Sequence, residues 1–598
     1  MQATGESCTL IVHQALAKPQ ITSMIPFRRL GLFVCAGLLQ LGPLNAPLEK
    51  LAGVSLCSCA SAQLPPKSGR EYYEETTRHG FRIRTPKDWG FFPDERGNPN
   101  VLGRYVPKRD GTVSQSDGTR FAPTMWLLVF DKSYEAPLIK NQRDAQRAAV
   151  TSYYKTLADW LKGRDVDLQT SITIADFEVL DEDESKVKGT LGGHEVLYLA
   201  KGEFRGPRGE KNPGSLHFWA KRFVLTEDKE VAVLFSAPSD KRDWSKWRSQ
   251  IRKIAGTFSR VDLEDLDTSS VSGSGVRAEK HRALLEMVGA NPGWELHATP
   301  NYFVISNSDD DEFLKEIKDR LEAIREQYEK EFPEELALAA SESQKQRRRD
   351  ARGKNKDGDK PAAPEAELSQ VQSASPRELS RCSVVRVCDS REDYMRYGGP
   401  AGSAGYWWSA TEELVIFDDQ ATGGRRNTWA TLNHEAFHQF IYYFFANLSP
   451  GTWYNEGNAD FYSGYKLNSR RHYELGRFDW RNSTIKAEIR EDKNVPLESL
   501  VAATKAQYYA RAPLTNPRTG QEDTFSRYPH GWSFMYFLRT GKTNRAKNWE
   551  ADWDAILPTY LATLIETGDP QAANDAAFTG VDWAALEASW SEYIVRGK

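Results

Sequence analysis

The chain has 598 residues, a formal net charge of −4 and a pI near 6.3. One hydrophobic core does not support a chain of this length, so we expect about three or four units, tails included. Acidic and basic residues are mixed along the chain, and no basic face of the kind that nucleic acid requires is indicated, so we expect no nucleic-acid partner.

Residues 1–62 are typical of an export segment. Arg28 and Arg29 precede the apolar run 30–41, and small residues lead to Ala60-Ser61-Ala62. This is the order of parts in a secretory signal peptide, and the apolar run is shorter than the about 20 residues of a membrane span. We therefore predict an exported protein, periplasmic, cell-surface or extracellular, with no stable membrane span in its mature form.

Cysteine usage adds an alternative at this end of the chain. Residues 56–59, Leu-Cys-Ser-Cys, resemble a lipoprotein-processing site, so a lipid anchor at Cys59 is the alternative to simple cleavage after Ala62. Cys382 and Cys388 are six residues apart on a predicted strand, about 20 Å when extended, and cannot pair with each other. We therefore expect no disulfide framework and predict both to be small core residues.

Residues 69–261 alternate short apolar runs with turns, which predicts a sheet domain. Strands are expected at 81–86, 125–130, 194–199, 216–225 and 231–237, and helices at 141–162 and 243–258. Strands with flanking helices indicate an α+β domain. No catalytic constellation occurs in it, and His194 and His217 lie in strand-like runs, so we predict a binding or positioning role. The opening Phe81-x-Ile83-x-x-Pro86-x-x-Trp89 resembles PsbP-like domains, as does the closing run 247–258.

Residues 262–280 are predicted to be a flexible linker, because Ser, Thr and Gly dominate their centre. The second domain is expected to span residues 281–598, with a strand at 302–306 and an amphipathic helix at 313–332. Residues 337–376 are rich in charged and small residues and poor in apolar ones, which predicts a disordered insertion. The rest indicates a mixed sheet followed by helices, so the whole chain is assigned to the α+β class.

The strongest functional signal is the sequence His434-Glu435-x-x-His438. Side chains at i and i+4 project from the same face of a helix, so both imidazoles can reach one ion while Glu435 leans over a water held by that ion. Two imidazoles and a neighbouring carboxylate are the parts of a hydrolytic zinc site.

A second pair of residues four apart, Glu456 and Asp460, follows at the expected start of another helix. Glu456 comes eighteen residues after His438, enough for the first helix to end, turn through Gly451 and return antiparallel. A metal would then have two nitrogen ligands and one oxygen ligand, with a fourth tetrahedral position for water. A structural zinc site is usually closed by four ligands that include thiolates, and no Cys is near, so the pattern indicates a catalytic site.

This ordered set of residues resembles the gluzincin group of metallopeptidases, and the core Asn455-Glu456-Gly457-x-Ala459 is similar to exported bacterial proteins of the peptidase MA superfamily. The resemblance implies a zincin-like fold with one zinc ion on His434, His438 and Glu456. It also implies that Glu435 is the general base, which later passes its proton to the leaving amine. Asp460 would accept the free N–H of a ligand imidazole, that of His434 in the first instance.

The resemblance implies two further features. A gluzincin needs a hydrogen-bond donor for the developing oxyanion, and Tyr528 and His530 are both candidates, ahead of a helix expected at 532–538. Zincins also bind substrate along an edge strand, and Gly405, Tyr406 and Trp407 would belong to it. Residues 405–408 and 414–417 form the predicted hairpin.

The sequence therefore predicts an exported zinc metallopeptidase with a polypeptide substrate. Two alternatives remain. One is a catalytically silent zincin-fold binding protein at the cell surface, which an edge strand blocked by residues 337–376 or by the N-terminal domain would favour. The other is a zinc amidase that acts on a non-peptide or cell-wall amide, because it would use the same residues.

Overall fold

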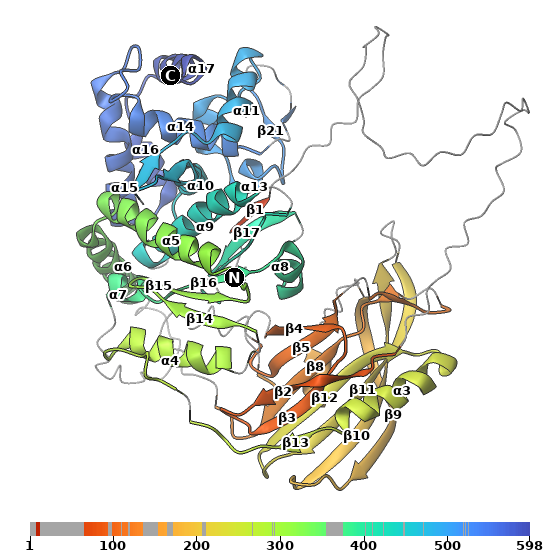
Figure 1. The fold of residues 1–598 in the computed structure, drawn as a ribbon. Coiled ribbons are helices and arrows are strands. Elements are labelled where there is room, and N and C mark those ends of the chain that lie inside the picture. Colours follow the sequence, from red (N-terminus) through yellow and green to blue (C-terminus); the bar gives the residue numbers. More distant parts are fainter. Residues whose placement is uncertain are drawn as a thin grey trace, which may run out of the picture.

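The computed structural model describes residues 8–11 and most of 65–597. The longer gaps are 136–152, 164–171, 206–210 and 355–374, and the shorter ones lie at 94–97, 109–110, 118–119, 266, 290, 292, 401, 410, 422–423, 446–448, 471, 518–519, 521 and 524–525. The chain has the predicted α+β class. Figure 1 shows a sheet-rich N-terminal unit below a second sheet, which is covered by a layer of helices.

The N-terminal unit is built on a seven-stranded antiparallel sheet. Its order is β4 (Trp89–Pro93), β5 (Val101–Pro107), β8 (Met125–Asp131), β12 (Lys229–Pro238), β11 (Lys211–Val224), β10 (Gly192–Arg205) and β9 (Ile172–Ser185). A second sheet has the order β13 (Ser259–Arg260), β3 (Phe81–Pro86) and β2 (Ser68–Glu75), and a small pair joins β6 (Val113–Ser114) to β7 (Arg120–Phe121). All five strands predicted for this region are confirmed.

Two helices of this unit are described, α2 (Leu157–Gly163) and α3 (Lys241–Ala255). The predicted helix at 243–258 is confirmed as α3, whose Trp247, Ile251 and Ile254 are buried against the sheets. Only the end of the predicted helix 141–162 can be compared, since 141–152 lie outside the described residues. His194 and His217 lie in β10 and β11, as predicted.

The predicted linker 262–280 is too long at its C-terminal end. Helix α4 (Val276–Gly289) begins inside it, because Ala278, His281 and Leu284 recur at helical spacing and are buried. Within the remaining stretch, the backbone N–H of Glu264 donates to the carbonyl of Thr76 at 2.8 Å, so this part contacts the first unit.

The second unit contains a six-stranded mixed sheet of order β1, β17, β18, β16, β15 and β14. The strands are β1 (Cys8–Ile11), β17 (Ser403–Trp408), β18 (Glu413–Phe417), β16 (Ser383–Cys388), β15 (Tyr302–Ser306) and β14 (Glu295–Ala298). The three central strands β15, β16 and β18 are parallel, and the others pair antiparallel. The predicted hairpin is therefore confirmed as β17 and β18. Cys382 and Cys388 are buried, as predicted.

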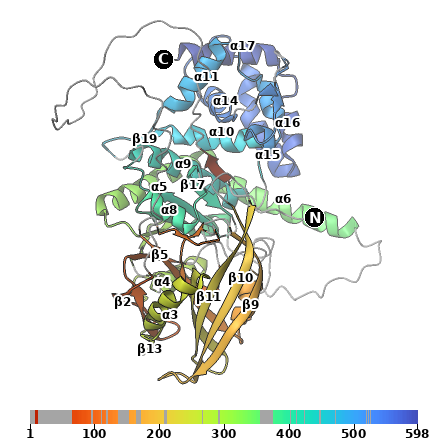
Figure 2. The ribbon, with the colours of Figure 1, turned by 90° about the vertical axis from the view of Figure 1, so that its right-hand side faces the viewer.

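Helices cover this sheet and form a layer beyond it (Figures 1 and 2). Those near the sheet are α5 (Asp311–Glu331), α6 (Glu334–Lys354), α7 (Pro376–Ser380), α8 (Arg391–Tyr397), α9 (Arg425–Phe445) and α10 (Thr452–Ser463). The outer layer contains α11 (Asp479–Arg490), α12 (Leu497–Ala502), α13 (Lys505–Tyr508), α14 (Tyr528–Thr540), η2 (Ala551–Ala555), α15 (Ile556–Thr567), α16 (Pro570–Ala577) and α17 (Trp583–Arg596). Its short strand pairs are β19 (Tyr465–Leu467) with β20 (Tyr473–Leu475), and β21 (Leu514–Thr515) with β22 (Glu522–Asp523).

The prediction that residues 337–376 are a disordered insertion is wrong for residues 337–354. They belong to helix α6, which runs outward from the layer of α5 and α9 (Figure 2). Ala337 and Ala340 are one helical turn apart and buried, and Arg347 donates to the carbonyl of Ile565 at 3.0 Å. Alanine, glutamate and arginine form helices well, so α6 needs only a narrow buried face. Residues 355–374 lie outside the described residues.

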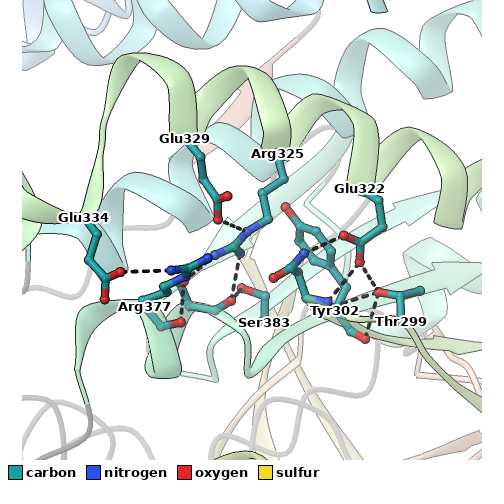
Figure 3. Close-up of polar contacts among 10 residues, drawn as sticks. Thr299, Tyr302, Glu322, Arg325, Glu329, Glu334, Arg377 and Ser383 are labelled. Atoms are coloured by element: carbon teal, nitrogen blue, oxygen red, sulfur yellow. Dashed lines mark hydrogen bonds and ion pairs between the residues drawn. The ribbon is translucent and has the colours of Figure 1, made fainter. Parts of the chain in front are cut away.

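Helix α5 is fixed to its neighbours by side chains on one face (Figure 3). Glu322 accepts hydrogen bonds from the loop before β15, including one from Asn301 N at 2.9 Å. The buried Arg325 donates to Ser380 Oγ at 2.6 Å and to Glu329 at 2.8 Å. The contacts of Glu322 with Asn301 and of Arg325 with Ser380 attach α5 to the loop before β15 and to α7.

The two units meet at helix α8. Arg396 donates to the carbonyls of Pro107 and Lys108, at 3.2 and 2.8 Å, and its guanidinium lies 5.3 Å from the centre of the Phe92 ring. Arg104 in turn donates to the carbonyl of Arg396. Among the residues described, no helix combines the length and apolar character needed to cross a membrane.

Candidate metal centre

The predicted metal ligands lie on two neighbouring buried helices, α9 and α10, together with Glu435 and Asp460. Helix α9 is buried around most of its circumference, as expected for a helix between a sheet and a helical layer. It can approach β17 closely because residue 405 is glycine, and a Cβ there would lie 2.6 Å from Thr431 Cγ2. Helix α10 begins after Gly451 and packs beside α9, as the spacing of the motifs predicted.

Three atoms that could ligate a metal ion converge between these helices. His434 Nε2 lies 3.1 Å from His438 Nε2 and 3.2 Å from Glu456 Oε2, and the third distance, from His438 Nε2 to Glu456 Oε2, is 3.5 Å. All three side chains are at most 3 % exposed. Nitrogen and oxygen ligands about 2.0–2.1 Å from a tetrahedral zinc ion lie about 3.3–3.4 Å apart. The arrangement therefore fits three corners of such a tetrahedron.

A chain of polar contacts fixes the orientation of His434. Its Nδ1 lies 3.0 Å from Asp460 Oδ1, and a carboxylate partner makes Nδ1 the donating nitrogen, so that Nε2 is the nitrogen directed at the centre. Asp460 is itself paired with the buried Arg481, whose Nε lies 2.8 Å from Oδ2. Asp460 lies where the sequence predicted, whereas Arg481 was not predicted.

The electrostatics of the three convergent groups reflect this proximity. Burial disfavours a charged imidazole, but hydrogen bonds with Asp460 and Glu456 outweigh it and raise the pKa of His434 to about 10. Burial alone would raise the pKa of Glu456, yet the nearby His438 and His434 hold it well below its usual range. The carboxylate of Glu456 is thus strongly favoured in its ionised form, the form that binds a cation.

Glu435 lies beside the centre and faces the sheet. Its Oε2 accepts a hydrogen bond of 2.9 Å from the backbone N–H of Trp407 in β17. Its Oε1 is buried and has no hydrogen-bond partner in the described part of the chain. Burial raises the pKa of Glu435, which makes this carboxylate a stronger base than an exposed one.

The two candidate oxyanion donors differ in their surroundings. Tyr528, the first residue of α14, has its ring centre 6.1 Å from that of His434, and the guanidinium of Arg481 lies 4.6 Å from the Tyr528 ring. His530 Nε2 instead accepts a hydrogen bond of 3.0 Å from Val495 N. Of the two, Tyr528 is the one whose ring contacts the imidazole of His434. The helix expected at 532–538 begins four residues earlier, at Tyr528.

Tyr509 was not predicted from the sequence. It follows α13, and its hydroxyl donates to Glu456 Oε1 at 2.6 Å. No sequence signal pointed to it or to Arg481, because neither stands in a spaced motif and both reach the centre only through the packing of the outer helices. Arg is mostly exposed in proteins and Tyr is intermediate, so neither residue type by itself indicates a buried position.

The edge strand predicted to bind substrate is β17, and it carries Gly405, Tyr406 and Trp407. In the full chain this edge is paired antiparallel with β1, so that Thr9 lies opposite Tyr406 and Cys8 opposite Trp407. The strand that covers the edge therefore comes from residues 8–11, within the predicted export segment, and not from residues 337–376 or the N-terminal domain.

Comparisons with known proteins give little. No family model matches the chain, and no curated protein matches it. The Ran-binding protein Mog1p of Saccharomyces cerevisiae matches 33 % of this chain and 97 % of its own, with 13 % identity and a TM-score of 0.19. A point mutant of protein Mog1 matches 32 % of this chain and 96 % of its own, with 14 % identity and a TM-score of 0.19. A Bacteroides thetaiotaomicron structure matches 42 % of this chain and 58 % of its own, with 11 % identity and a TM-score of 0.12. Likenesses this small do not indicate a function.

Proposed function

We propose that the protein is an exported zinc-dependent metallopeptidase that hydrolyses peptide bonds. The observation that carries the proposal is the tetrahedral spacing of His434, His438 and Glu456, with the base Glu435 beside them. Two nitrogens and one carboxylate oxygen form the ligand set of hydrolytic zinc sites that keep one position open. Export is supported by the signal-like order of residues 1–62.

A zinc ion bound here would polarise the carbonyl of the substrate's peptide bond and lower the pKa of a bound water to about 7. The protein's own residues would do the rest. Glu435 Oε1 accepts the proton of the attacking water and returns it to the leaving amine, while Trp407 N–H holds the other oxygen of Glu435. Asp460 keeps His434 in the tautomer that presents Nε2. The Tyr528 hydroxyl is the donor for the developing oxyanion.

One observation favours a second candidate, a zincin-fold binding protein without turnover. Strand β1 pairs with the edge of β17, where an extended peptide would add to the sheet. A chain whose own segment held that edge permanently would bind zinc without cleaving peptides. The two candidates therefore differ in turnover and not in metal binding.

The test compares wild-type protein with Glu435→Gln and His438→Ala, each analysed for zinc and for cleavage of a mixed peptide library. We expect Glu435→Gln to retain zinc and to lose about a hundredfold or more in rate, because only the base is removed. His438→Ala should lose stoichiometric zinc. A Glu435→Gln protein with zinc and undiminished cleavage would refute the mechanism. A zinc-loaded wild type that cleaves no peptide would favour the binding protein.

A further inference from the structure

The two oxygens of the Glu456 carboxylate have different partners. Oε2 faces the ring nitrogens of His434 and His438, at 3.2 and 3.5 Å. Oε1 accepts a hydrogen bond of 2.6 Å from the hydroxyl of Tyr509, and a bond this short is typical of an ionised acceptor oxygen. Only one oxygen of this carboxylate is therefore directed at the centre.

This division matters for the number of ligands that the site provides. A carboxylate can bind a metal ion through one oxygen or through both. With one oxygen from Glu456 and two imidazoles, a tetrahedral ion keeps one position for water, whereas a second oxygen would raise the coordination number and occupy that region. A donor that holds Oε1 away from the ion therefore preserves the open position.

Tyr509 is itself held in place. Helix α13 starts with a capping box, in which Thr504 and Gln507 bond each other's backbone N–H, and Tyr509 N donates to the carbonyl of Lys505 at 3.1 Å. The Tyr509 ring packs 5.9 Å from Tyr528 and 5.7 Å from Tyr508, measured between ring centres. The hydroxyl thus reaches Glu456 from a fixed backbone and an aromatic cluster, at little entropic cost.

We propose that Tyr509 is a positioning residue that keeps Glu456 a one-oxygen ligand and thereby keeps the fourth coordination position open. The proposal rests on the proposed metal site and adds to it a residue that no motif includes. Its consequence is specific: without this hydroxyl, Oε1 is free to turn toward the ion, and the coordination number rises before any substrate is present.

The experiment uses the full chain loaded with Co²⁺ in place of zinc, because four-coordinate Co²⁺ absorbs visible light several-fold more strongly than five-coordinate Co²⁺. We expect wild type to show strong absorption and Tyr509→Phe to show several-fold weaker absorption at equal Co²⁺ occupancy. Peptide hydrolysis by the zinc form should fall about ten- to a hundredfold.

Tyr508→Phe is the matched control. It removes the same group from the preceding residue, whose buried hydroxyl has no hydrogen-bond partner among the described residues, and its ring contacts the same cluster. Its Co²⁺ spectrum should equal that of wild type. Circular dichroism of all three proteins should be the same, which excludes misfolding as the cause of a spectral change.

Two results would overturn the proposal, and they are distinguishable. If Tyr509→Phe has the wild-type spectrum, Tyr509 does not control coordination, whatever happens to the rate, and a fall in rate alone would make it a substrate contact. If wild type binds no Co²⁺ at all, the metal site itself is refuted, and the role of Tyr509 with it.

Discussion

Asp460→Asn is the substitution that tests the supports of the proposed metal site most severely. The side chain is fully buried and contacts both His434, at 3.0 Å, and Arg481, at 2.8 Å. An amide of the same shape keeps the packing but removes the charge. Arg481, at 2 % exposure, would then be a buried cation without its counter-ion.

Two magnitudes follow from these contacts. Breaking a buried ion pair by neutralising one partner costs about 3–5 kcal/mol, because the other charge stays desolvated. Loss of the carboxylate that orients a ligand imidazole weakens metal binding by about ten- to a hundredfold. We therefore expect a free energy of unfolding about 3–5 kcal/mol lower in the metal-free protein, and a zinc dissociation constant raised by one to two orders of magnitude.

Urea denaturation of the metal-free protein and zinc competition against a chelator measure the two quantities. Asp479→Asn is the matched control, since Asp479 is 59 % exposed and pairs with Arg426 at the surface. Surface pairs contribute at most about 1 kcal/mol, so this variant should bind zinc like wild type. An Asp460→Asn protein with wild-type stability and wild-type zinc affinity would refute the assignment of Asp460 as the support of His434.

Three more outcomes are expected. Removing residues 1–62 takes away β1 and frees the edge of β17. The kcat/KM for a peptide should then rise roughly tenfold, which corresponds to the free energy of one or two backbone hydrogen bonds. An unchanged kcat/KM would show that β1 does not compete with substrate. Burial and Arg527 lower the pKa of His530 to about 3 in the folded protein, below its value near 6.5 in the unfolded chain. The stability that the neutral imidazole contributes is therefore present above pH 6.5 and is lost as the pH falls toward 3. The free energy of unfolding decreases by about 1.4 kcal/mol for each pH unit in this window. Urea midpoints of wild type should fall more steeply than those of His530→Gln between pH 6.5 and 4.5, and parallel curves would contradict this. Arg396→Ala removes the hydrogen bonds that the Arg396 side chain on α8 donates to the N-terminal unit. Limited proteolysis should therefore separate the two units faster than in wild type. Equal cleavage rates would show that Arg396 does not hold the interface.

The parts of the site that were predictable are those set by local periodicity. His434 and His438 are four residues apart on one helix, and Glu456 with Asp460 repeats that spacing on the next, so helical geometry alone brings each pair to one face. Two short apolar runs separated by turn residues are likewise a local signal, and they predicted the hairpin of β17 and β18.

The parts that were missed depend on tertiary packing or on narrow burial. Tyr509 contacts Glu456 across a sequence separation of 53 residues, and Arg481 contacts Asp460 across 21 residues. No helical or strand periodicity links residues this far apart in the sequence. The composition of α6 predicts disorder because the buried side chains among its described residues are the small ones of Ala337 and Ala340, so the helix lacks the apolar stripe that identifies α5. The pairing of β1 with β17 is equally non-local.

The most direct test of the central claim is diffraction from crystals of the zinc-loaded protein at wavelengths on either side of the zinc absorption edge. The account predicts one anomalous peak per chain, about 2.0–2.1 Å from His434 Nε2, His438 Nε2 and Glu456 Oε2, with a fourth ligand that is not a protein atom. A peak elsewhere, a fourth protein ligand that closes the site, or no peak in zinc-saturated crystals would contradict it.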